Sequence, residues 1–399
     1  MTERLYLLDS EYSTCDALVT ACQGGEGGWL VTLDKSVFFP NKGGQPCDLG
    51  TIGGAAVTAC FEREGELYHV CDRPLEIGER VKAEIDYNRR FDIMQQHTGE
   101  HVLSYCAWKE FSAVNVGFHC AMDYATLDLD KPLTQEEVWQ LERLANATVS
   151  ENRSVSAKIY NSEDDIKDIP LRKHAEGLTA PIRLVTVEGG DCCTCCAPHV
   201  KSTGMIGHIK IVDAMAYKGG LRITFLCGSR ATEYSRRVQA ELTKIARLFS
   251  TSYDKAFEAV VKQGEELSNL KRELRAAIAE TDRRYAEELI GGAKQVRGIR
   301  LTVALVSPMD GKRLKNLCTS TLFGKSLSVL LSPFNGQVGY VLSCSELDMD
   351  MGECIAAVNA ALNGKGGGRG TLAQGSAKER PDLAGTVLQL SDYFERLLR

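Results

Sequence analysis

The sequence predicts a mixed α+β protein of several domains, and three features indicate this class. The chain of 399 residues is long enough to form two or three hydrophobic cores. Short alternating segments between glycine-rich turns fill the first part, as in a small β-barrel or sandwich. A stretch without proline, rich in Ala, Glu, Lys, Leu and Arg, is typical of a long helix. We expect a β-barrel domain at 1–90, an α+β domain at 91–230, a helical spacer at 231–290 and an α/β domain at 291–399.

The composition is that of an ordinary soluble protein with a mild negative charge. The chain is 44% hydrophobic and 25% charged, and its formal net charge of −6 argues against a generally basic nucleic-acid-binding protein. No apolar run approaches the roughly 18 residues that span a bilayer, and the amino-terminal sequence lacks the pattern of an export signal. We therefore expect a cytoplasmic protein without a membrane partner. Its fifteen cysteines are then reduced thiols, most of them buried.

The first domain is expected to be built from short strands. Glycine pairs at 24–25, 43–44 and 53–54 provide turns between segments rich in β-formers. Alternation of apolar and polar side chains in these segments is typical of strands with one buried face. The expected strands are 29–33, 55–60, 66–70 and 81–85.

The second domain is expected to combine helices and strands. Residues 88–111 have helical periodicity, with His97 and His101 on one face beside apolar side chains. Thr134 followed three residues later by Glu137 forms a capping box, which predicts a helix at 133–150. The remaining residues of the domain give extended segments at 116–129, 183–187, 206–212 and 221–227.

The last part of the chain changes character twice. Residues 230–290 predict one long helix or a helical hairpin, serving as a spacer or a dimerisation element. Buried strands are then expected at 301–306 and 326–331, and a glycine-rich loop at 364–370 before a helical terminus. Residues 291–325 hold seven Lys or Arg against one acidic residue, a local charge of +6. This stretch is either a solvated surface or a site that follows a phosphate backbone.

Histidine and cysteine residues from two distant segments predict a zinc site. Two histidines four residues apart, His97 and His101, lie one above the other on a helix. A Cys-x-x-x-His or Cys-x-x-His pair ending at His199 provides a thiolate and a further imidazole, the ligands that zinc prefers. Spacing alone leaves open whether Cys195 or Cys196 is the ligand. We expect Cys192 and Cys193 to be reduced thiols in a turn.

The same pentapeptide matches a second kind of zinc enzyme. His97-Thr-Gly-Glu-His101 fits the His-x-x-Glu-His pattern of inverted metallopeptidases, in which Glu100 would activate water. Gly99 is a poor helix former, and a cysteine ligand is unusual for such peptidases. A third reading is a binding module whose zinc is structural, because four protein ligands close a structural site.

Four segments resemble the editing and carboxyl-terminal regions of alanyl-tRNA synthetases. The pentapeptide 97–101 is similar to His-Thr-Ala-Thr-His, and 195–207 is similar to Cys-Gly-Gly-Thr-His-Val with Thr-Gly-x-Ile-Gly after it. Residues 38–50 resemble the Gly-Gly-Gln segment of the preceding barrel, and 366–374 resemble the glycine-rich segment of the DHH-associated (C-Ala) domain. Because the aminoacylation region is missing, the chain resembles the long form of the freestanding alanyl-tRNA editing proteins, AlaX.

This resemblance implies a hydrolase that acts in trans for translation fidelity. Its expected substrate is tRNA(Ala) carrying a wrong amino acid, most of all seryl-tRNA(Ala), with glycyl-tRNA(Ala) second. The reaction is ester hydrolysis with one Zn²⁺ per chain, and the motif register favours Cys195 over Cys196 as the fourth ligand. The domain at 91–230 would then be the editing domain, and the domain at 291–399 would bind tRNA. Glu100 stands where the family commonly has Thr, and Cys196-Ala-Pro198 replaces Gly-Gly-Thr.

Further site residues are expected on both sides of the zinc ligands. Neutral donors and acceptors suit a hydroxyl or a ribose, and exposed glycine N–H groups with basic side chains suit a phosphate. ATP binding is not expected because the chain lacks a Gly-Lys-Ser/Thr phosphate loop, and a homodimer through the spacer or the last domain is a further expectation. Catalytic candidates are Gln45, Thr98, Glu100 and Asn115; binding candidates are Gly117, His119, Gly366, Gly367, Gly368 and Arg369.

Overall fold

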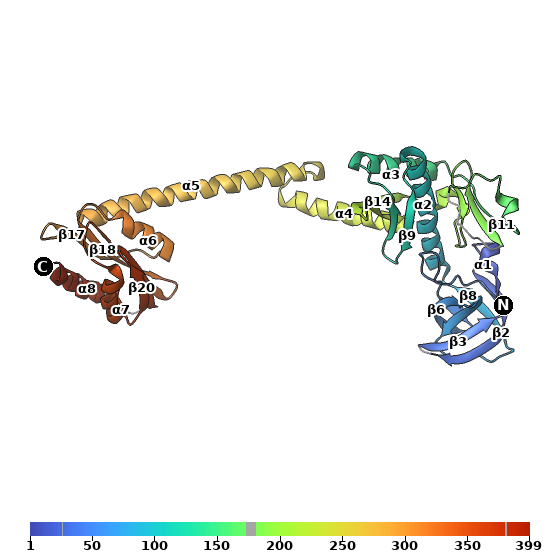
Figure 1. Cartoon of the computed structure of the whole chain (residues 1–399), viewed down its shortest axis with the longest axis horizontal. Helices are drawn as coiled ribbons and strands as arrows, with labels where there is room; N and C mark the ends of the chain where they lie inside the picture. Colours follow the sequence, from blue (N-terminus) through green and yellow to red (C-terminus); the bar gives the residue numbers. More distant parts are fainter. Residues whose placement is uncertain (26, 173–180, 380) are drawn as a thin grey trace. The chain divides into compact units, whose positions relative to one another are not determined.

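The computed structural model describes residues 1–25, 27–172, 181–379 and 381–399. The chain divides into two units, Met1–Leu248 and Phe249–Arg399, and each contains both helices and sheets (Figure 1). The predicted mixed α+β class is therefore confirmed. Within the described residues, none of the helices combines the length and the apolar character needed to cross a membrane.

Six strands at the start of the first unit close into a barrel in the order β2-β3-β7-β6-β5-β8. Alternation builds its interior: along β8 the side chains of Val81, Ala83 and Ile85 are buried, and their neighbours are exposed. The short strand β1 pairs in parallel with β4 beside the barrel, and α1 follows β1. The elements are β1 (Glu3–Arg4), α1 (Leu5–Leu8), β2 (Thr14–Gly25), β3 (Gly28–Leu33), β4 (Lys35–Ser36), β5 (Gly50–Ile52), β6 (Ala55–Arg63), β7 (Glu66–Cys71) and β8 (Arg80–Ile85).

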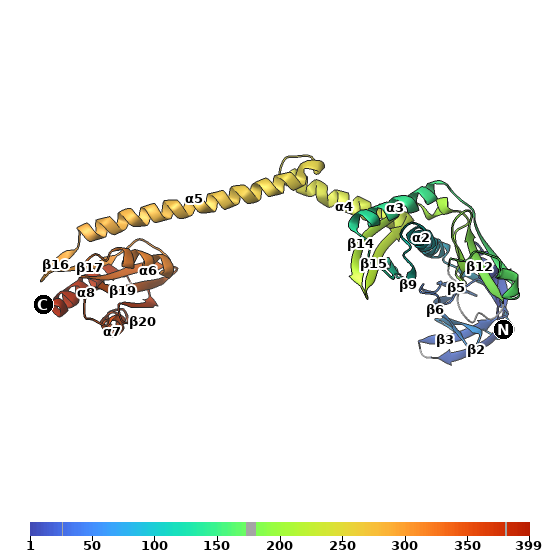
Figure 2. The same ribbon diagram turned by 45° about the horizontal axis from the view of Figure 1, so that its top comes forward.

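The rest of the first unit surrounds one helix, α2 (Tyr87–Phe111). A sheet in the order β14-β15-β10-β9 and a smaller sheet in the order β11-β12-β13 lie on different sides of it (Figure 2). The capping box at Thr134 and Glu137 is present at the start of α3. The other elements are β9 (Asn115–Cys120), β10 (Ala125–Leu129), α3 (Gln135–Ser150), β11 (Val155–Tyr160), η1 (Asp164–Ile166), β12 (Ile182–Val187), β13 (Cys192–Thr194), η2 (Thr203–Ile206), β14 (Ile209–Tyr217), β15 (Gly220–Cys227) and α4 (Gly228–Leu248).

Helix α2 is fixed at both its start and its middle. The Asp86 side chain caps its first turn by accepting from the N–H of Arg89. The fully buried Arg90 ties the helix to the barrel, because its Nε donates to Asp48 Oδ1 at 2.8 Å and its Nη2 to the carbonyl of Val37 at 2.7 Å. A Cβ on Gly99 would lie 2.3 Å from Cys227 Sγ, so a larger residue here would displace the buried Cys227 side chain at the end of β15.

The predicted helical spacer is two helices. Helix α4 ends the first unit, and α5 (Ala256–Gly291) begins the second after the short turn η3 (Tyr253–Lys255). The second unit contains a six-stranded sheet in the order β16-β17-β18-β19-β21-β20, in which β17 and β18 are the parallel pair. Its other elements are β16 (Lys294–Val296), β17 (Ile299–Leu305), α6 (Gly311–Ser320), β18 (Ser326–Phe334), β19 (Gln337–Ser345), α7 (Met351–Leu362), β20 (Lys365–Arg369), β21 (Leu372–Lys378) and α8 (Leu383–Leu398).

The prediction of a glycine-rich loop at 364–370 was wrong. Residues Lys365–Arg369 form the edge strand β20, which pairs with β21. A Cβ on Gly368 would meet the Leu372 carbonyl oxygen at 2.3 Å, and one on Gly366 would meet the Gly375 Cα at 2.6 Å. Two of these glycines therefore allow a close approach between backbone segments, where the sequence suggested flexibility.

Candidate metal centre

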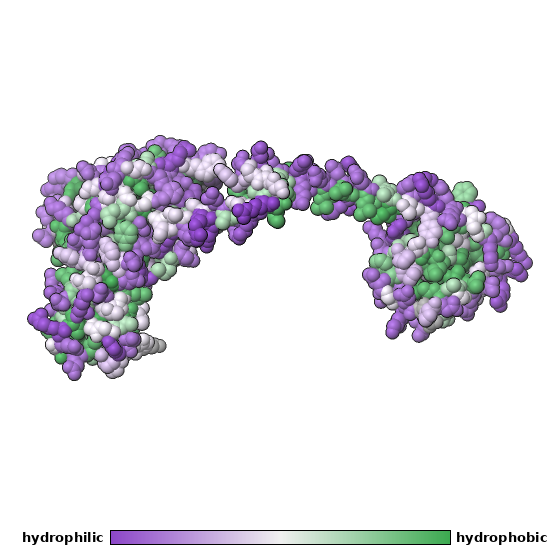
Figure 3. Space-filling view, turned by 180° about the vertical axis from the view of Figure 1, so that it is seen from behind, coloured by the Kyte–Doolittle hydropathy of each residue, from purple (hydrophilic) through white to green (hydrophobic). Residues whose placement is uncertain are grey.

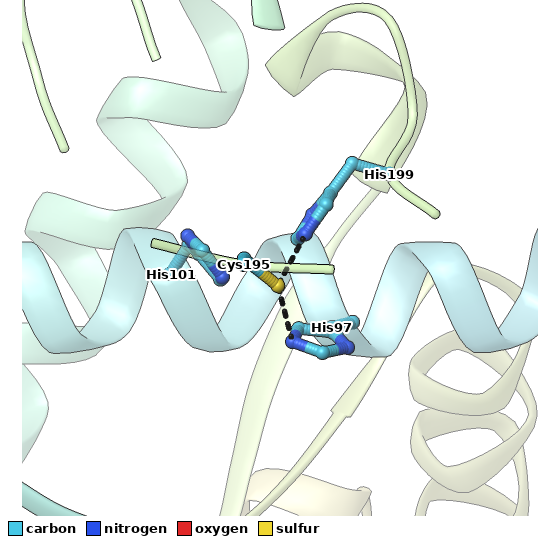
Figure 4. Close-up of side chains that lie close together, drawn as sticks. All are labelled: His97, His101, Cys195 and His199. Atoms are coloured by element: carbon cyan, nitrogen blue, oxygen red, sulfur yellow. Dashed lines mark hydrogen bonds between the residues drawn. The ribbon is translucent and has the colours of Figure 1, made fainter. Parts of the chain in front are cut away.

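Four side chains from three separate segments form one cluster in the first unit. His97 and His101 project from α2, Cys195 follows β13, and His199 lies on the segment before η2 (Figure 4). The ligand atoms of all four residues lie within 4.8 Å of one another. Cys195 Sγ is 3.6 Å from His97 Nε2 and 3.3 Å from His199 Nε2. Cys196 is exposed and is outside this cluster.

Each imidazole in the cluster is oriented through its other nitrogen. The Nδ1 of His97 is 2.5 Å from Gln45 Oε1, and the Nδ1 of His199 is 3.0 Å from Thr98 Oγ1. The Nδ1 of His101 is 2.9 Å from Asp191 Oδ2. These contacts leave Nε2 of each ring for a ligand, the arrangement common among metal-binding histidines. The cluster therefore suits a metal ion.

Protonation favours the same conclusion for two of the four groups. Burial raises the pKa of the Cys195 thiol, but its interactions with His97 and His199, together with hydrogen bonds from His101 and His199, outweigh burial and hold that pKa well below its usual range. Burial lowers the pKa of His199 to about 3. A thiolate and a neutral imidazole are the forms that bind a metal.

A buried ion pair behind His101 was missed in the sequence. Arg172 donates through Nε to Asp191 Oδ1 at 2.6 Å and through Nη2 to Oδ2 at 3.1 Å. Burial raises the pKa of Asp191, but hydrogen bonds from His101 and Arg172 outweigh burial and bring that pKa below its usual range. Asp191 is thus a carboxylate that fixes the ring of His101. The position of Asp191 directly before the cysteines at 192–196 could have drawn attention to it in the sequence. Nothing in the sequence pointed to Arg172.

The expectation that Cys192 and Cys193 lie in a turn was wrong, because both belong to strand β13. Cys193 is buried, and its Sγ lies 3.5 Å from both His101 Nδ1 and Asp191 Oδ2. Burial raises the pKa of Cys193, which favours the thiol. Cys193 thus packs against the imidazole–carboxylate pair behind the cluster.

A cavity of about 790 Å³ opens on the cluster. His97, His101 and Cys195 form part of its wall. The wall is mixed in character, with aromatic rings, basic groups and two carboxylates. Its other residues are Arg4, Tyr6, Leu7, Phe39, Lys42, Gly43, Glu62, Glu100, Asn115, Phe118, Ile159, Arg172, Pro181, Ile182, Arg183, Cys193, Thr194, Cys196 and Ala197.

The catalytic candidates divide into two groups. Glu100 and Asn115 line the cavity, and Asn115 Nδ2 donates to Glu100 Oε1 at 2.5 Å. Gln45 and Thr98 are buried and contact the imidazoles of His97 and His199 without lining the cavity. The structure therefore brings all four residues to the His–Cys cluster, and Gln45 and Thr98 lie on the far side of it from the cavity.

The binding candidates do not lie at this cavity. Gly117 N–H donates to Asn115 Oδ1 at 2.8 Å, and His119 is exposed on β9; neither lines the wall. Gly366, Gly367, Gly368 and Arg369 are exposed on β20 of the second unit.

Known proteins share sequence with most of the chain. The model of the threonyl and alanyl tRNA synthetase second additional domain matches residues 182–224, a range that holds Cys195 and His199. The alanyl-tRNA editing protein AlaX-L of Pyrococcus horikoshii is 26% identical over 393 residues, which cover 96% of each chain. The alanyl-tRNA editing protein Aarsd1 of Mus musculus is 30% identical over 252 residues, 61% of each chain. The alanine–tRNA ligase of Ignicoccus hospitalis is 27% identical over 93% of this chain, which spans 41% of the ligase.

Among solved structures, the C-Ala domain of Aquifex aeolicus alanyl-tRNA synthetase matches 26% of this chain and 97% of its own. The identity is 23% and the TM-score is 0.24, too low to support a structural argument. The sequence matches extend along nearly the whole chain, and the resemblance to freestanding alanyl-tRNA editing proteins of the long type is confirmed.

Proposed function

We propose that this protein is a zinc-dependent hydrolase that removes wrong amino acids from tRNA(Ala). Seryl-tRNA(Ala) is the first expected substrate and glycyl-tRNA(Ala) the second. One observation carries the proposal: a cavity of about 790 Å³ opens on the cluster of His97, His101, Cys195 and His199, and the first three of these residues form part of its wall. Support comes from the relatives, since a chain matched over 96% of its length is an alanyl-tRNA editing protein.

Zinc is the metal that this donor set favours. Three imidazoles and a thiolate are common zinc ligands, whereas Mg²⁺ and Ca²⁺ prefer oxygen. Zinc supplies Lewis-acid chemistry, polarising either a water molecule or the ester carbonyl. Catalysis requires a coordination position beyond the four side chains, or displacement of one of them.

The protein's own residues supply orientation around that metal. Gln45, Thr98 and Asp191 fix the three imidazoles, and Asn115 fixes Glu100 at the cavity wall. A site that hydrogen-bonds a serine hydroxyl rejects alanine by up to about 10⁴–10⁵, because alanine leaves buried polar groups unpaired. Such a site removes serine and spares correctly charged tRNA(Ala).

The second unit is the proposed tRNA-binding part, as a DHH-associated domain. Lys312 and Lys315 lie on α6 and Arg369 lies on β20, where they could contact phosphates, whereas Arg313 is engaged with Asp282 at 2.7 Å. Apolar side chains are exposed along α5 (Figure 3), among them Phe257, Leu267, Leu270 and Leu274. These side chains support the proposal of a homodimer through this helix, which sedimentation at several protein concentrations would test.

Hydrolysis assays test the function directly. The wild-type protein is incubated with seryl-tRNA(Ala) and alanyl-tRNA(Ala), beside a His101→Ala variant and a His208→Ala control outside the cluster. We expect rapid loss of the seryl ester, little loss of the alanyl ester, and no activity for His101→Ala. If neither ester is cleaved faster than in buffer by zinc-loaded protein, the proposal fails, and a structural zinc is favoured. Cleavage of peptides in place of esters would favour the metallopeptidase reading.

A further inference from the structure

Phe323 is an exposed aromatic residue of the second unit, on the short segment between α6 and β18. It is 71% exposed. Its backbone is fixed on both sides, because its N–H donates to Ser326 Oγ at 3.1 Å and its carbonyl accepts from Arg300 Nη1 at 3.4 Å. A ring held in place at the surface offers a π face and apolar area to a partner.

Arg300 lies beside the ring of Phe323. The carbon at the centre of its guanidinium group is 5.4 Å from the ring centroid, within the range of a cation–π contact. The sheet fixes this position, since Arg300 is paired with Ser326 of β18 and its N–H donates to the carbonyl of Lys325 at 2.9 Å. Nucleobases that are free of their own stack pack on aromatic rings and on arginine planes of this kind.

Three basic side chains lie at this end of the sheet, and none of them has an ion-pair partner among the described residues. Arg297 is exposed in the turn that joins β16 to β17, Arg300 lies near the start of β17, and Lys325 is exposed directly before β18. By contrast, Lys294 and Arg313 of the same basic stretch pair with carboxylates. Three cations without counter-charges around an exposed ring suit a ligand with both anionic groups and flat apolar faces.

Acidic residues at this end of the sheet lie apart from that group. Glu346 and Asp348 follow β19, and β18 separates β19 from β17 in the strand order. The three cations therefore stand on the β16–β17 side of β18, together with the ring.

We infer that Phe323 stacks on an unstacked nucleobase of tRNA beside Arg300, while Arg297 and Lys325 contact the flanking phosphates. This inference rests on the proposed tRNA-binding role of the second unit. An apolar protein partner would match the ring but leave the cations without counter-charges, whereas RNA supplies both. Every base has a π face, so the contact adds affinity without reading the sequence.

The test measures binding of the full-length protein to uncharged tRNA(Ala) at several salt concentrations. We expect Phe323→Ala to bind about 5- to 30-fold more weakly at every salt concentration, the effect of losing one stacked base. The slope of log Kd against log salt should stay unchanged, because stacking releases no counterions. Replacing both Arg297 and Lys325 by Gln should instead reduce that slope by about two.

Two further substitutions separate stacking from simple apolar contact. Phe323→Tyr keeps an aromatic ring and should bind tRNA within about twofold of the wild type. Phe323→Leu keeps apolar area without a π face and should bind as weakly as Phe323→Ala.

A matched control and a kinetic measurement complete the design. Phe334 is a second exposed phenylalanine of this unit, at the opposite end of β18, so Phe334→Ala should bind tRNA like the wild type. Hydrolysis of seryl-tRNA(Ala) should show a raised KM and an unchanged kcat in Phe323→Ala. The seryl ester of adenosine alone, which lacks the rest of the tRNA, should be cleaved equally by Phe323→Ala and the wild type.

The outcomes separate the inference from the function. Wild-type affinity in Phe323→Ala or in Phe323→Leu overturns the inference and leaves the proposed function standing. If Phe323→Ala keeps its tRNA affinity but self-associates less in sedimentation, the ring belongs to a contact between copies and the inference is overturned. If the wild-type protein binds no tRNA, the tRNA-binding role and the inference both fail. If it binds tRNA but cleaves no seryl ester, the hydrolase fails and the binding data decide the inference. If Phe323→Ala melts early, the comparison of Phe323→Tyr with Phe323→Leu decides, and equal affinities overturn the inference.

Discussion

Asp191→Asn tests how the metal cluster is held together. The carboxylate of Asp191 lies 2.9 Å from His101 Nδ1 and 2.6 Å from Arg172 Nε. The amide that replaces this carboxylate has only one acceptor oxygen, which is uncharged. It can accept a hydrogen bond from His101 or from Arg172, and the negative charge that fixed the imidazole is lost. A hydrogen bond to a charged group contributes about 1.5–3 kcal/mol, and partners of this kind change metal affinity by about 10- to 100-fold.

Competition with a chromophoric chelator measures this change. We expect Asp191→Asn to bind zinc about 10- to 100-fold more weakly than the wild-type protein. Asp213→Asn, on the exposed part of β14, is the matched control and should bind zinc like the wild type. Thermal melting of the metal-free proteins measures the separate cost of leaving Arg172 without its carboxylate. An Asp191→Asn affinity within about twofold of wild type would refute the proposed role of this ion pair.

Three other changes test the fold and the tRNA-binding proposal. His69 is fully buried between Ser36 Oγ and the Val31 carbonyl, and burial lowers its pKa from 6.5 to about 4. Between pH 6.5 and about 4 the imidazole binds a proton in the unfolded chain but not in the folded one, so the free energy of unfolding falls as the pH falls, by up to about 3 kcal/mol. Denaturant unfolding should therefore show a weaker dependence of this free energy on pH in His69→Gln than in the wild type. An equal dependence in the two proteins would contradict this. Gly368→Ala should destabilise the protein by about 1–3 kcal/mol, whereas Gly367→Ala, with no atom within 4 Å of its Cβ, should melt like wild type; equal melting temperatures would contradict the close approach at β20. Lys312→Gln with Lys315→Gln should weaken tRNA binding and reduce the slope of log Kd against log salt by about two if both lysines contact phosphates, and an unchanged slope would remove α6 from the tRNA-binding surface.

Local sequence patterns predicted helices and strands, whereas contacts between distant residues depend on the tertiary fold and could not be predicted from these patterns. The i, i+4 spacing of His97 and His101 predicted a shared helix face, because that geometry is fixed within one turn. The capping box at Thr134 correctly predicted the start of α3, because its hydrogen bonds also lie within one turn. Arg172 and Asp191 lie nineteen residues apart and meet through the fold alone. Strand β20 was taken for a loop because glycine signals both flexibility and close approach, and the neighbouring chain decides between them.

The same distinction between local pattern and tertiary fold applies to the predicted site residues. Gln45 contacts the imidazole of His97 and Thr98 that of His199, and the catalytic role that the sequence predicts for both stays a prediction. The direction of a β-strand side chain depends on register, which places His119 on the exposed side of β9, and its role in substrate binding stays a prediction. A pattern in the sequence can bring a residue to the site without showing which way it faces.

Zinc titration into the metal-free protein, with seryl-tRNA(Ala) hydrolysis as the readout, tests the central claim most directly. The claim is that His97, His101, Cys195 and His199 hold the metal on which hydrolysis depends. We expect no activity without metal, and a linear rise in activity that stops at one zinc per chain, as for a single four-ligand site. Full hydrolysis by protein shown to be free of metal, or a rise that continues well beyond one equivalent, would contradict the claim.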